Sequence, residues 1–129
     1  MNAKYIAKEI LSQLGGSEFI AMTGSNKFGY GEDDKNNPFL QFDLDQNEYN
    51  IHKYSRVRIV LMPSDTYKLF FYQENDSKHE EVHYVENIYC DQLKDIFELE
   101  TNLLVTFNQR RNSSVRVEGG GFFGKLVRG

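Results

Sequence analysis

The amino-acid sequence predicts a single α+β domain, with an N-terminal helix, an antiparallel meander of about four to six strands, and a second helix packed on the same sheet face. Two observations carry this prediction. Apolar residues recur with helical spacing at the N-terminus and again near residue 95, and they alternate with polar residues in between. A chain of 129 residues is also long enough for one domain with its own core and too short for two ordinary ones.

Residues 2–14 form the first predicted helix. Its apolar side chains fall on one helical face: Tyr5, Ile6, Ile10, Leu11 and Leu14. Gly15 and Gly16 follow, and glycine readily supplies the left-handed residue that ends many helices. We therefore expect the helix to stop there and residues 19–22 to form a short apolar first strand. Residues 25–38 are rich in turn formers and charge, so we expect a loop.

Three runs of alternating side chains follow, in residues 39–44, 56–62 and 67–73. Period-two runs separated by short turns are typical of an antiparallel meander. The third run is apolar on both faces, because Phe70 and Tyr72 alternate with Leu69 and Phe71. Such a strand is either covered on both sides or contributes an exposed aromatic surface, and it allows a homodimer.

A helical period returns in residues 90–100, where Leu93, Ile96 and Phe97 lie about one turn apart. Residues 103–107 and 115–117 are candidate late strands. We place the single α+β domain in residues 1–107. Residues 108–129 form a basic, Gly-rich C-terminal segment, which we expect to be a terminal strand or hairpin, or a tail that orders on binding.

Charge is unevenly distributed along the chain. Residues 1–107 hold 18 acidic and 10 basic side chains, a net charge of −8, whereas residues 108–129 hold one acidic and five basic side chains, a net charge of +4. An acidic body repels phosphate backbones, and a short basic segment attracts them. The C-terminal segment is therefore the part of the chain that most favours nucleic acid.

Three landmarks share their order and spacing with a known group of proteins: Leu14-Gly15-Gly16 with Phe19 and Met22-Thr23-Gly24, then Asp65-Thr66-Tyr67, then Tyr89 with Asp91-Gln92-Leu93 and Phe97. Over residues 10–103 the chain resembles a group of small uncharacterised proteins encoded by bacteriophages, prophages and plasmids. Asn102 stands where a glycine is usual, and the sequence after Leu103 falls outside the shared pattern. The resemblance implies an origin in a mobile genetic element and a bacterial cytoplasm. The group has no established activity, so the resemblance assigns no site.

Residues 79–83 read His-Glu-Glu-Val-His, the H-E-x-x-H pattern of zinc hydrolases. On a helix, His79 and His83 would lie one turn apart and share a zinc ion, with Glu80 as general base. On a strand they lie roughly 13 Å apart, since each residue advances about 3.3 Å, and ligands bound at about 2 Å cannot span that distance. The β-branched and aromatic neighbours favour a strand. We therefore expect no metal site, with a small zinc hydrolase as an alternative.

Other catalytic and cofactor motifs are missing from the sequence. It contains no glycine-rich phosphate loop, no G-x-S-x-G and no EF-hand loop, so we expect neither an enzyme nor a cofactor. The single cysteine, Cys90, excludes an internal disulfide and favours a reducing compartment. The N-terminus leads directly into an amphipathic pattern, so we expect no signal peptide and no membrane partner.

Aromatic residues are the candidate partner-binding residues: Phe28, Tyr30, Phe70, Tyr72, Phe122 and Phe123. We predict a non-catalytic accessory protein that binds a host or phage protein, for example as an inhibitor of a bacterial defence system. The alternative is a nucleic-acid-binding module that combines basic and stacking groups. Its candidate cations are Arg56, Arg58, Arg110, Arg111, Arg116, Lys125 and Arg128.

Overall fold

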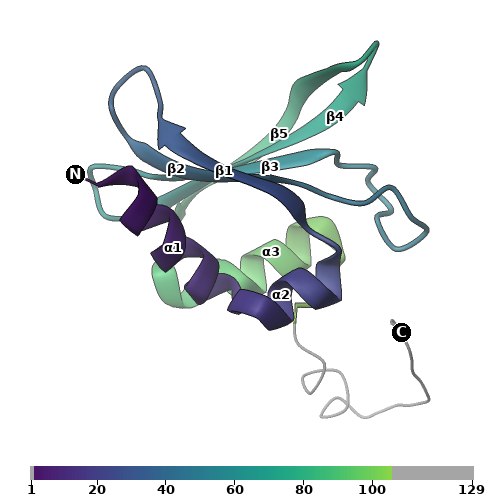
Figure 1. Ribbon diagram of the computed structural model, residues 1–129, viewed down its shortest axis with the longest axis horizontal. Coiled ribbons are helices and arrows are strands. Elements are labelled where there is room, and N and C mark those ends of the chain that lie inside the picture. The colour runs from purple at the N-terminus through teal and green to yellow at the C-terminus, as the bar shows by residue number, and fades with distance from the viewer. Residues whose placement is uncertain (1, 106–129) are drawn as a thin grey trace.

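The computed structural model describes residues 2–105, and it confirms the predicted α+β class. The elements are α1 (Ala3–Leu14), α2 (Gly16–Thr23), β1 (Asn26–Glu32), β2 (Pro38–Asp43), β3 (Arg56–Leu61), β4 (Tyr67–Asn75), β5 (Lys78–Ile88), the 3-10 turn η1 (Cys90–Gln92) and α3 (Leu93–Thr101). The strands form one antiparallel sheet in the order β1-β2-β3-β4-β5. All three helices lie on the same side of this sheet (Figure 1).

The core lies between the sheet and the helix layer. Alternate residues of β2, β3 and β4 point toward the helices and are almost completely buried: Leu40, Phe42, Val57, Ile59, Leu69 and Phe71. The helices cover them with Ile10 and Leu14 of α1, Phe19 of α2 and Phe97 of α3. The Phe19 ring packs edge-on at 5.4 Å from the Phe42 ring and 5.1 Å from the Phe97 ring. One aromatic cluster therefore joins both helical segments to the sheet.

Helix α1 begins and ends close to the predicted residues. Asn2 caps its start, because the side-chain oxygen accepts the Tyr5 N–H at 3.1 Å. Gly15 ends it with a φ of 127° that side chains rarely adopt. The helix ends at Gly15 as predicted, and Gly16 is already the first residue of α2.

The predicted first strand at residues 19–22 is wrong, because these residues belong to α2. A short apolar run does not distinguish a strand from a buried helix by its periodicity. The helix is preferred here because it buries Phe19 completely and lets the Thr23 hydroxyl donate to the Phe19 carbonyl oxygen at 2.7 Å. Gly24, in the left-handed conformation, then ends α2.

The predicted loop at residues 25–38 is also wrong in part, since β1 occupies residues 26–32. β1 is an outer strand that pairs with β2. Its glycines and exposed side chains give no alternation of apolar and polar residues, so the sequence pattern does not indicate a strand.

The tight turn that follows is held by Asp33. Burial acts to raise the pKa of Asp33, but the N–H groups of Lys35 and Asn37 donate to its carboxylate and hold the pKa below its ordinary value of 3.8.

The remaining elements agree with the sequence. β2, β3 and β4 coincide with the three alternating runs, and η1 with α3 coincides with the second predicted helix. Residues 79–86 lie in β5, as expected for a strand. Residues 103–105 follow α3 without strand structure, so this part of the predicted late strand is wrong. Residues 106–129, with the candidate strand at 115–117 and the proposed domain boundary, lie outside the described residues.

Candidate functional site

No helix or strand within residues 2–105 covers the sheet face turned away from the helices, and we call it the open face (Figure 1). Strand register places its side chains in rows that cross the sheet. Four aromatic and three basic side chains stand in these rows: Phe39, Phe70, Tyr72 and Tyr84, with Arg56, Arg58 and Lys68. Tyr84 is the most exposed of these rings, at 48%. The open face therefore combines rings with cations, and aromatic residues and arginine are enriched at binding interfaces.

The central row of the open face is built around Arg58. Its Nε and Nη2 atoms donate to Gln41 Oε1 at 2.9 Å and 2.6 Å. Its guanidinium carbon lies 4.1 Å from the centre of the Phe39 ring, a cation–π distance. Phe39 in turn lies over Gly31, where an added Cβ would be only 3.1 Å from Phe39 Cζ. Because Gln41 is neutral, the positive charge of Arg58 is held in place without being compensated.

A second row joins Asp43, Arg56, Tyr72 and Glu81 across four strands. Arg56 Nε donates to Asp43 Oδ1 at 2.7 Å, so this cation is neutralised locally. Burial raises the pKa of the Tyr72 phenol above its ordinary value of 10.0. Arg58 and Arg56 oppose this rise, and Glu81 adds to it. The phenol is therefore neutral at physiological pH and available as a hydrogen-bond donor.

Lys68 forms the third cationic position, between two rings. Its Nζ lies 4.6 Å from the centre of the Tyr84 ring and 5.1 Å from that of Phe70. Glu86 Oε1 is 3.9 Å away, at the limit of an ion pair. The ring centres of Phe70 and Tyr84 are 6.3 Å apart. A cation between two rings orients both aromatic side chains before any partner arrives.

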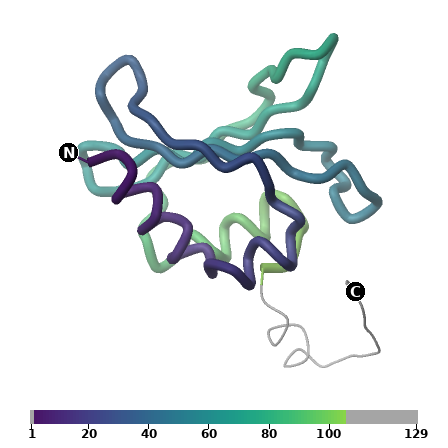
Figure 2. The backbone as a smooth tube through the Cα atoms, viewed as in Figure 1, coloured from purple at the N-terminus to yellow at the C-terminus, as the bar shows by residue number. Residues whose placement is uncertain are grey.

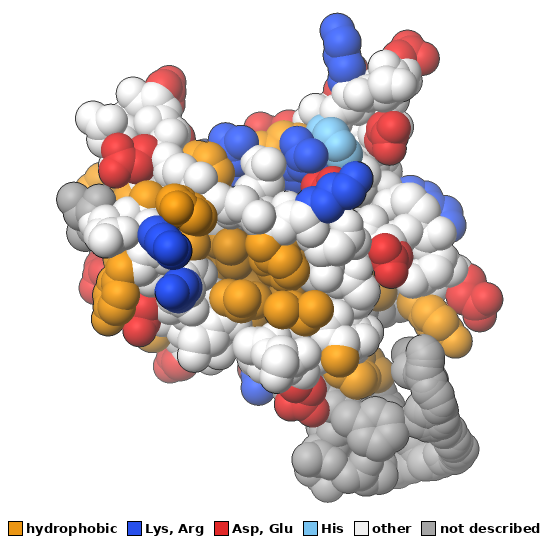
Figure 3. All heavy atoms as spheres, viewed as in Figure 1, with side chains coloured by type: hydrophobic (Ala, Val, Ile, Leu, Met, Phe, Trp, Pro, Cys, Tyr) orange, Lys and Arg blue, Asp and Glu red, His pale blue; other side chains and the backbone are white. Residues whose placement is uncertain are grey.

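The shape of the open face is set by two hairpins. The β1–β2 and β4–β5 hairpins lie at opposite ends of the sheet, and both bend away from the helix layer (Figure 2). Lys and Arg side chains gather on the surface between these projections (Figure 3). Acidic side chains stand on the same face, among them Asp43, Glu81 and Glu86. The cations of the open face therefore stand among anions, within a body whose net charge is −8 over residues 1–107.

The structure distributes the predicted site residues over several places. Phe70, Tyr72, Arg56 and Arg58 come together on the open face. Phe28 and Tyr30 lie instead on the helix-facing side of β1, since Tyr30 pairs with the buried Leu40 and the Phe28 ring lies 5.3 Å from the Phe42 ring. The other predicted residues lie outside the described part of the chain: Phe122, Phe123, Arg110, Arg111, Arg116, Lys125 and Arg128.

Sequence reasoning missed three members of the open face, Phe39, Lys68 and Tyr84. Phe39 belongs to the same alternating set as Gln41 and Asp43, so the period of two contained the signal. Lys68 likewise alternates with Leu69. Tyr84 had no such signal, because a register shift in β5 separates it from the simple alternation.

The His-Glu-Glu-Val-His segment lies in β5 and not on a helix. His79 Nδ1 is 2.8 Å from the buried Ser55 hydroxyl, and His83 Nε2 is 2.7 Å from Glu100 Oε1. The two histidines therefore contact different neighbours. On a strand they also lack the one-turn spacing that would let them share a zinc ion. Within residues 2–105, no three His, Cys, Asp or Glu side chains are grouped so as to hold a metal ion.

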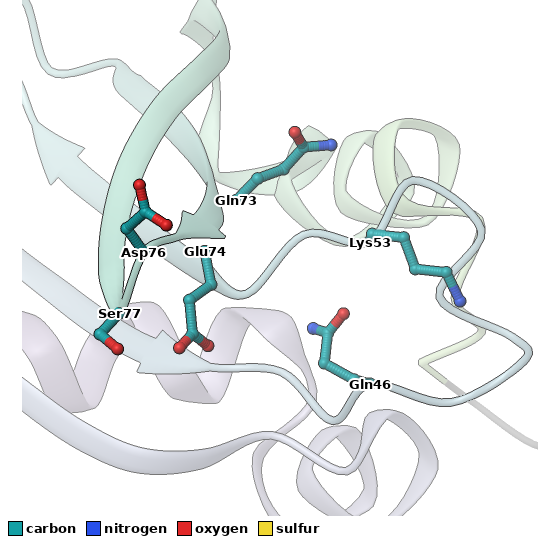
Figure 4. Close-up of a pocket in the computed structure, with 6 residues that line it drawn as sticks. All are labelled: Gln46, Lys53, Gln73, Glu74, Asp76 and Ser77. Atoms are coloured by element: carbon teal, nitrogen blue, oxygen red, sulfur yellow. The ribbon is translucent and has the colours of Figure 1, made fainter.

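A polar pocket of about 640 Å³ opens between residues 46–53 and the β4–β5 hairpin. Its lining side chains are Gln46, Lys53, Gln73, Glu74, Asp76 and Ser77. Two of them already hold the loop in place, since the amides of Gln46 and Gln73 donate to the carbonyl oxygens of Tyr54 and His52. The side chains do not converge on one point (Figure 4). The pocket lacks the apolar walls and convergent polar groups of a small-molecule site.

No protein-family model, curated protein or solved structure matches the chain. The site is therefore interpreted from its geometry. No helix within residues 2–105 has the length and apolar character needed to cross a membrane.

Proposed function

We propose that this protein is a non-catalytic binding module whose open face binds another protein. The observation that carries the proposal is the alternation of rings and cations on a sheet face that no other part of residues 2–105 covers. Aromatic residues and arginine are enriched in protein interfaces because they combine a large contact area with polar groups. A host or phage protein is the partner that a mobile-element origin would supply, and inhibition of a defence system is one outcome of such binding.

Charge supports a protein in preference to a nucleic acid. The open face carries acidic side chains beside its basic ones, and the body around it is acidic. A phosphate backbone is repelled by such a body, whereas a mixed protein surface can match both signs. The rings of Phe39, Phe70 and Tyr84 are also already in contact with cations of this chain, so base stacking would have to displace those contacts.

Single-stranded nucleic acid is the second candidate. It is favoured by one observation: Arg56 and Arg58 stand beside Phe70 and Tyr72 on an antiparallel sheet, as in proteins that stack unpaired bases on exposed strands. This candidate predicts an affinity for single-stranded oligonucleotides that falls steeply with salt and is lost when residues 108–129 are removed. Binding that resists both changes would rule it out.

The test is affinity capture from a bacterial lysate with two matched double variants. Arg58→Glu with Tyr84→Ala alters the open face, and Lys4→Glu with Tyr5→Ala makes the same changes of charge and ring on exposed positions of α1. We expect the wild-type chain and the α1 variant to retain a stoichiometric protein, and the open-face variant to lose it. Equal retention by both variants would place the binding surface elsewhere. Nuclease-sensitive capture would favour the second candidate.

A further inference from the structure

Arg58 differs from Arg56 and Lys68, the other two cations named on the open face. Arg56 and Lys68 each form an ion pair with a carboxylate of this chain. Arg58 forms no ion pair within residues 2–105, and its hydrogen-bond acceptor is the neutral amide oxygen of Gln41. A cation without a local anion is a position where an anion of a binding partner adds favourable charge complementarity.

The guanidinium of Arg58 keeps one edge free for a ligand. Nε and Nη2 both donate to Gln41 Oε1, so the edge between these two nitrogens is occupied. A guanidinium has five N–H groups, and those of Nη1 and the second one of Nη2 remain. Arg58 forms no other hydrogen bond with residues 2–105. The edge between Nη1 and Nη2 therefore retains the two parallel donors that bind a carboxylate as a fork.

This guanidinium is held in position before a ligand binds. Its central carbon lies 4.1 Å from the centre of the Phe39 ring, and Gln41 fixes its side. Phe70 stands directly opposite Arg58 on β4. A side chain that is already ordered loses little conformational entropy on binding, which strengthens each contact that it makes.

Tyr72 supplies a second donor beside Arg58. Its hydroxyl forms no hydrogen bond with any residue in the range 2–105. Burial raises the pKa of the Tyr72 phenol, and Arg58 opposes this rise more strongly than Arg56 does, although Arg56 is the residue directly opposite Tyr72. The phenol therefore lies nearer to the charge of Arg58. A neutral phenol O–H beside a guanidinium suits one oxyanion.

The acidic side chains of the open face lie in the rows on either side of Arg58. The row that contains Arg58 crosses four strands without an acidic residue: Gln41, Arg58, Phe70 and Tyr84. Asp43 and Glu81 belong to the row on one side, and Glu86 lies against Lys68 on the other. A single carboxylate can reach Arg58 between these acids, whereas a polynucleotide would bring further phosphates against them.

We propose that the open face recognises a carboxylate side chain of its protein partner. This carboxylate binds as a fork to the Nη1–Nη2 edge of Arg58 and accepts a hydrogen bond from the Tyr72 hydroxyl. An apolar side chain near it on the partner packs on the exposed ring of Tyr84. Phe39 and Gln41 are positioning residues, because they orient Arg58 and leave that edge free. Since it names the partner's chemistry at the same face, this assignment rests on the function proposed above.

Two matched peptides test the carboxylate. The probes are acetyl-Leu-Asp-Leu-amide and acetyl-Leu-Asn-Leu-amide, which differ by one charge. In NMR titrations of the full chain, we expect the Asp peptide to shift the Arg58 Nε–H signal and to bind about tenfold more tightly than the Asn peptide. Equal binding of both peptides, or no shift with the Asp peptide at millimolar concentration, would overturn the proposal. A larger shift of the same signal with oligothymidylate would overturn it in favour of a phosphate.

Substitution of the two donors tests the geometry. Arg58→Gln should weaken binding of the Asp peptide about tenfold, and Arg58→Lys should weaken it less, because lysine keeps the charge and loses the fork. Tyr72→Phe should weaken it about threefold, since one hydrogen bond is lost. Lys8→Gln removes a charge from an exposed position of α1 and should leave the affinity unchanged. Unchanged affinity in Arg58→Gln, with native circular dichroism, would contradict the proposal.

Capture from the bacterial lysate separates this proposal from the proposed function. Arg58→Gln and Tyr84→Ala are compared as single variants with the wild-type chain. We expect Arg58→Gln to lose the partner that the wild-type chain retains. Loss in Tyr84→Ala alone would leave the open face as the binding surface and overturn recognition by Arg58. Retention by both variants would overturn the proposed function and this assignment with it.

Discussion

Strand β4 shows the two faces of this sheet on neighbouring residues. Leu69 and Phe71 point into the helix layer and have no exposed surface, whereas Phe70 and Tyr72 point to the open face and stay partly exposed. The same strand therefore stabilises the fold with one set of aromatic residues and presents the other set on the face that we propose as a binding surface. The comparison teaches that aromatic content alone does not indicate a core, because the face on which a ring stands decides its role.

The largest expected difference is between the stability losses caused by Phe71→Ala and Phe70→Ala. Phe71→Ala should lower the free energy of unfolding by about 3–5 kcal/mol, because it leaves a cavity among packed rings. Phe70→Ala should lower it by less than about 1 kcal/mol, since the ring is already partly in water. Urea unfolding of both variants measures the difference. Equal losses would show that the open face is part of the core.

Polar side chains should show the same contrast with a smaller effect. Asn50 is fully buried, and its amide bonds the backbone of Tyr54 as both donor and acceptor, at 2.7 Å and 3.1 Å. Asn50→Ala should cost about 1–3 kcal/mol, because it leaves buried backbone groups without partners. Gln41→Ala on the open face should cost less than about 1 kcal/mol, since Arg58 can turn to water. Thermal unfolding of both variants measures the two losses. A larger loss of stability for Gln41→Ala than for Asn50→Ala would contradict the comparison.

The smallest effect concerns the ionisation of two tyrosines on opposite faces. Burial raises the pKa values of both Tyr67 and Tyr72 above 10.0, so the stability that each contributes is complete below pH 10 and is lost as pH rises through its folded pKa. Arg58 opposes the rise only at Tyr72. Arg58→Gln should therefore raise the pKa of Tyr72 further and leave that of Tyr67 unchanged. Tyrosine carbon NMR across an alkaline titration measures both, and a parallel change would contradict the assignment of Arg58 to one face.

Much of the fold was predictable because its central strands are regular. β2, β3 and β4 bury alternate residues, so the period of two appears directly in the sequence. The helix α2 was not predictable, since eight residues with one buried phenylalanine give no helical period, and its preference comes from packing against Phe42 and Phe97. β1 was hidden for the opposite reason: as an edge strand with two glycines, it has no buried set to alternate.

The candidate site was predictable only in part. Phe70, Tyr72, Arg56 and Arg58 could be placed on one face from alternation alone. Tyr84 could not, because its pairing with Phe70 depends on a bulged register between β4 and β5 that local sequence does not specify. The position of Phe28 and Tyr30 on an outer strand of the sheet could be known only from the strand order.

Site-specific photo-crosslinking in living bacteria tests the central claim most directly, that the open face is the binding surface. Benzoylphenylalanine replaces Tyr84 on the open face or Tyr5 on α1, and Tyr5 is the more exposed of the two, at 60% against 48%. The account predicts a covalent adduct with a second protein from position 84 and only background from position 5. An adduct of equal or greater yield from position 5, or none from position 84, would contradict it.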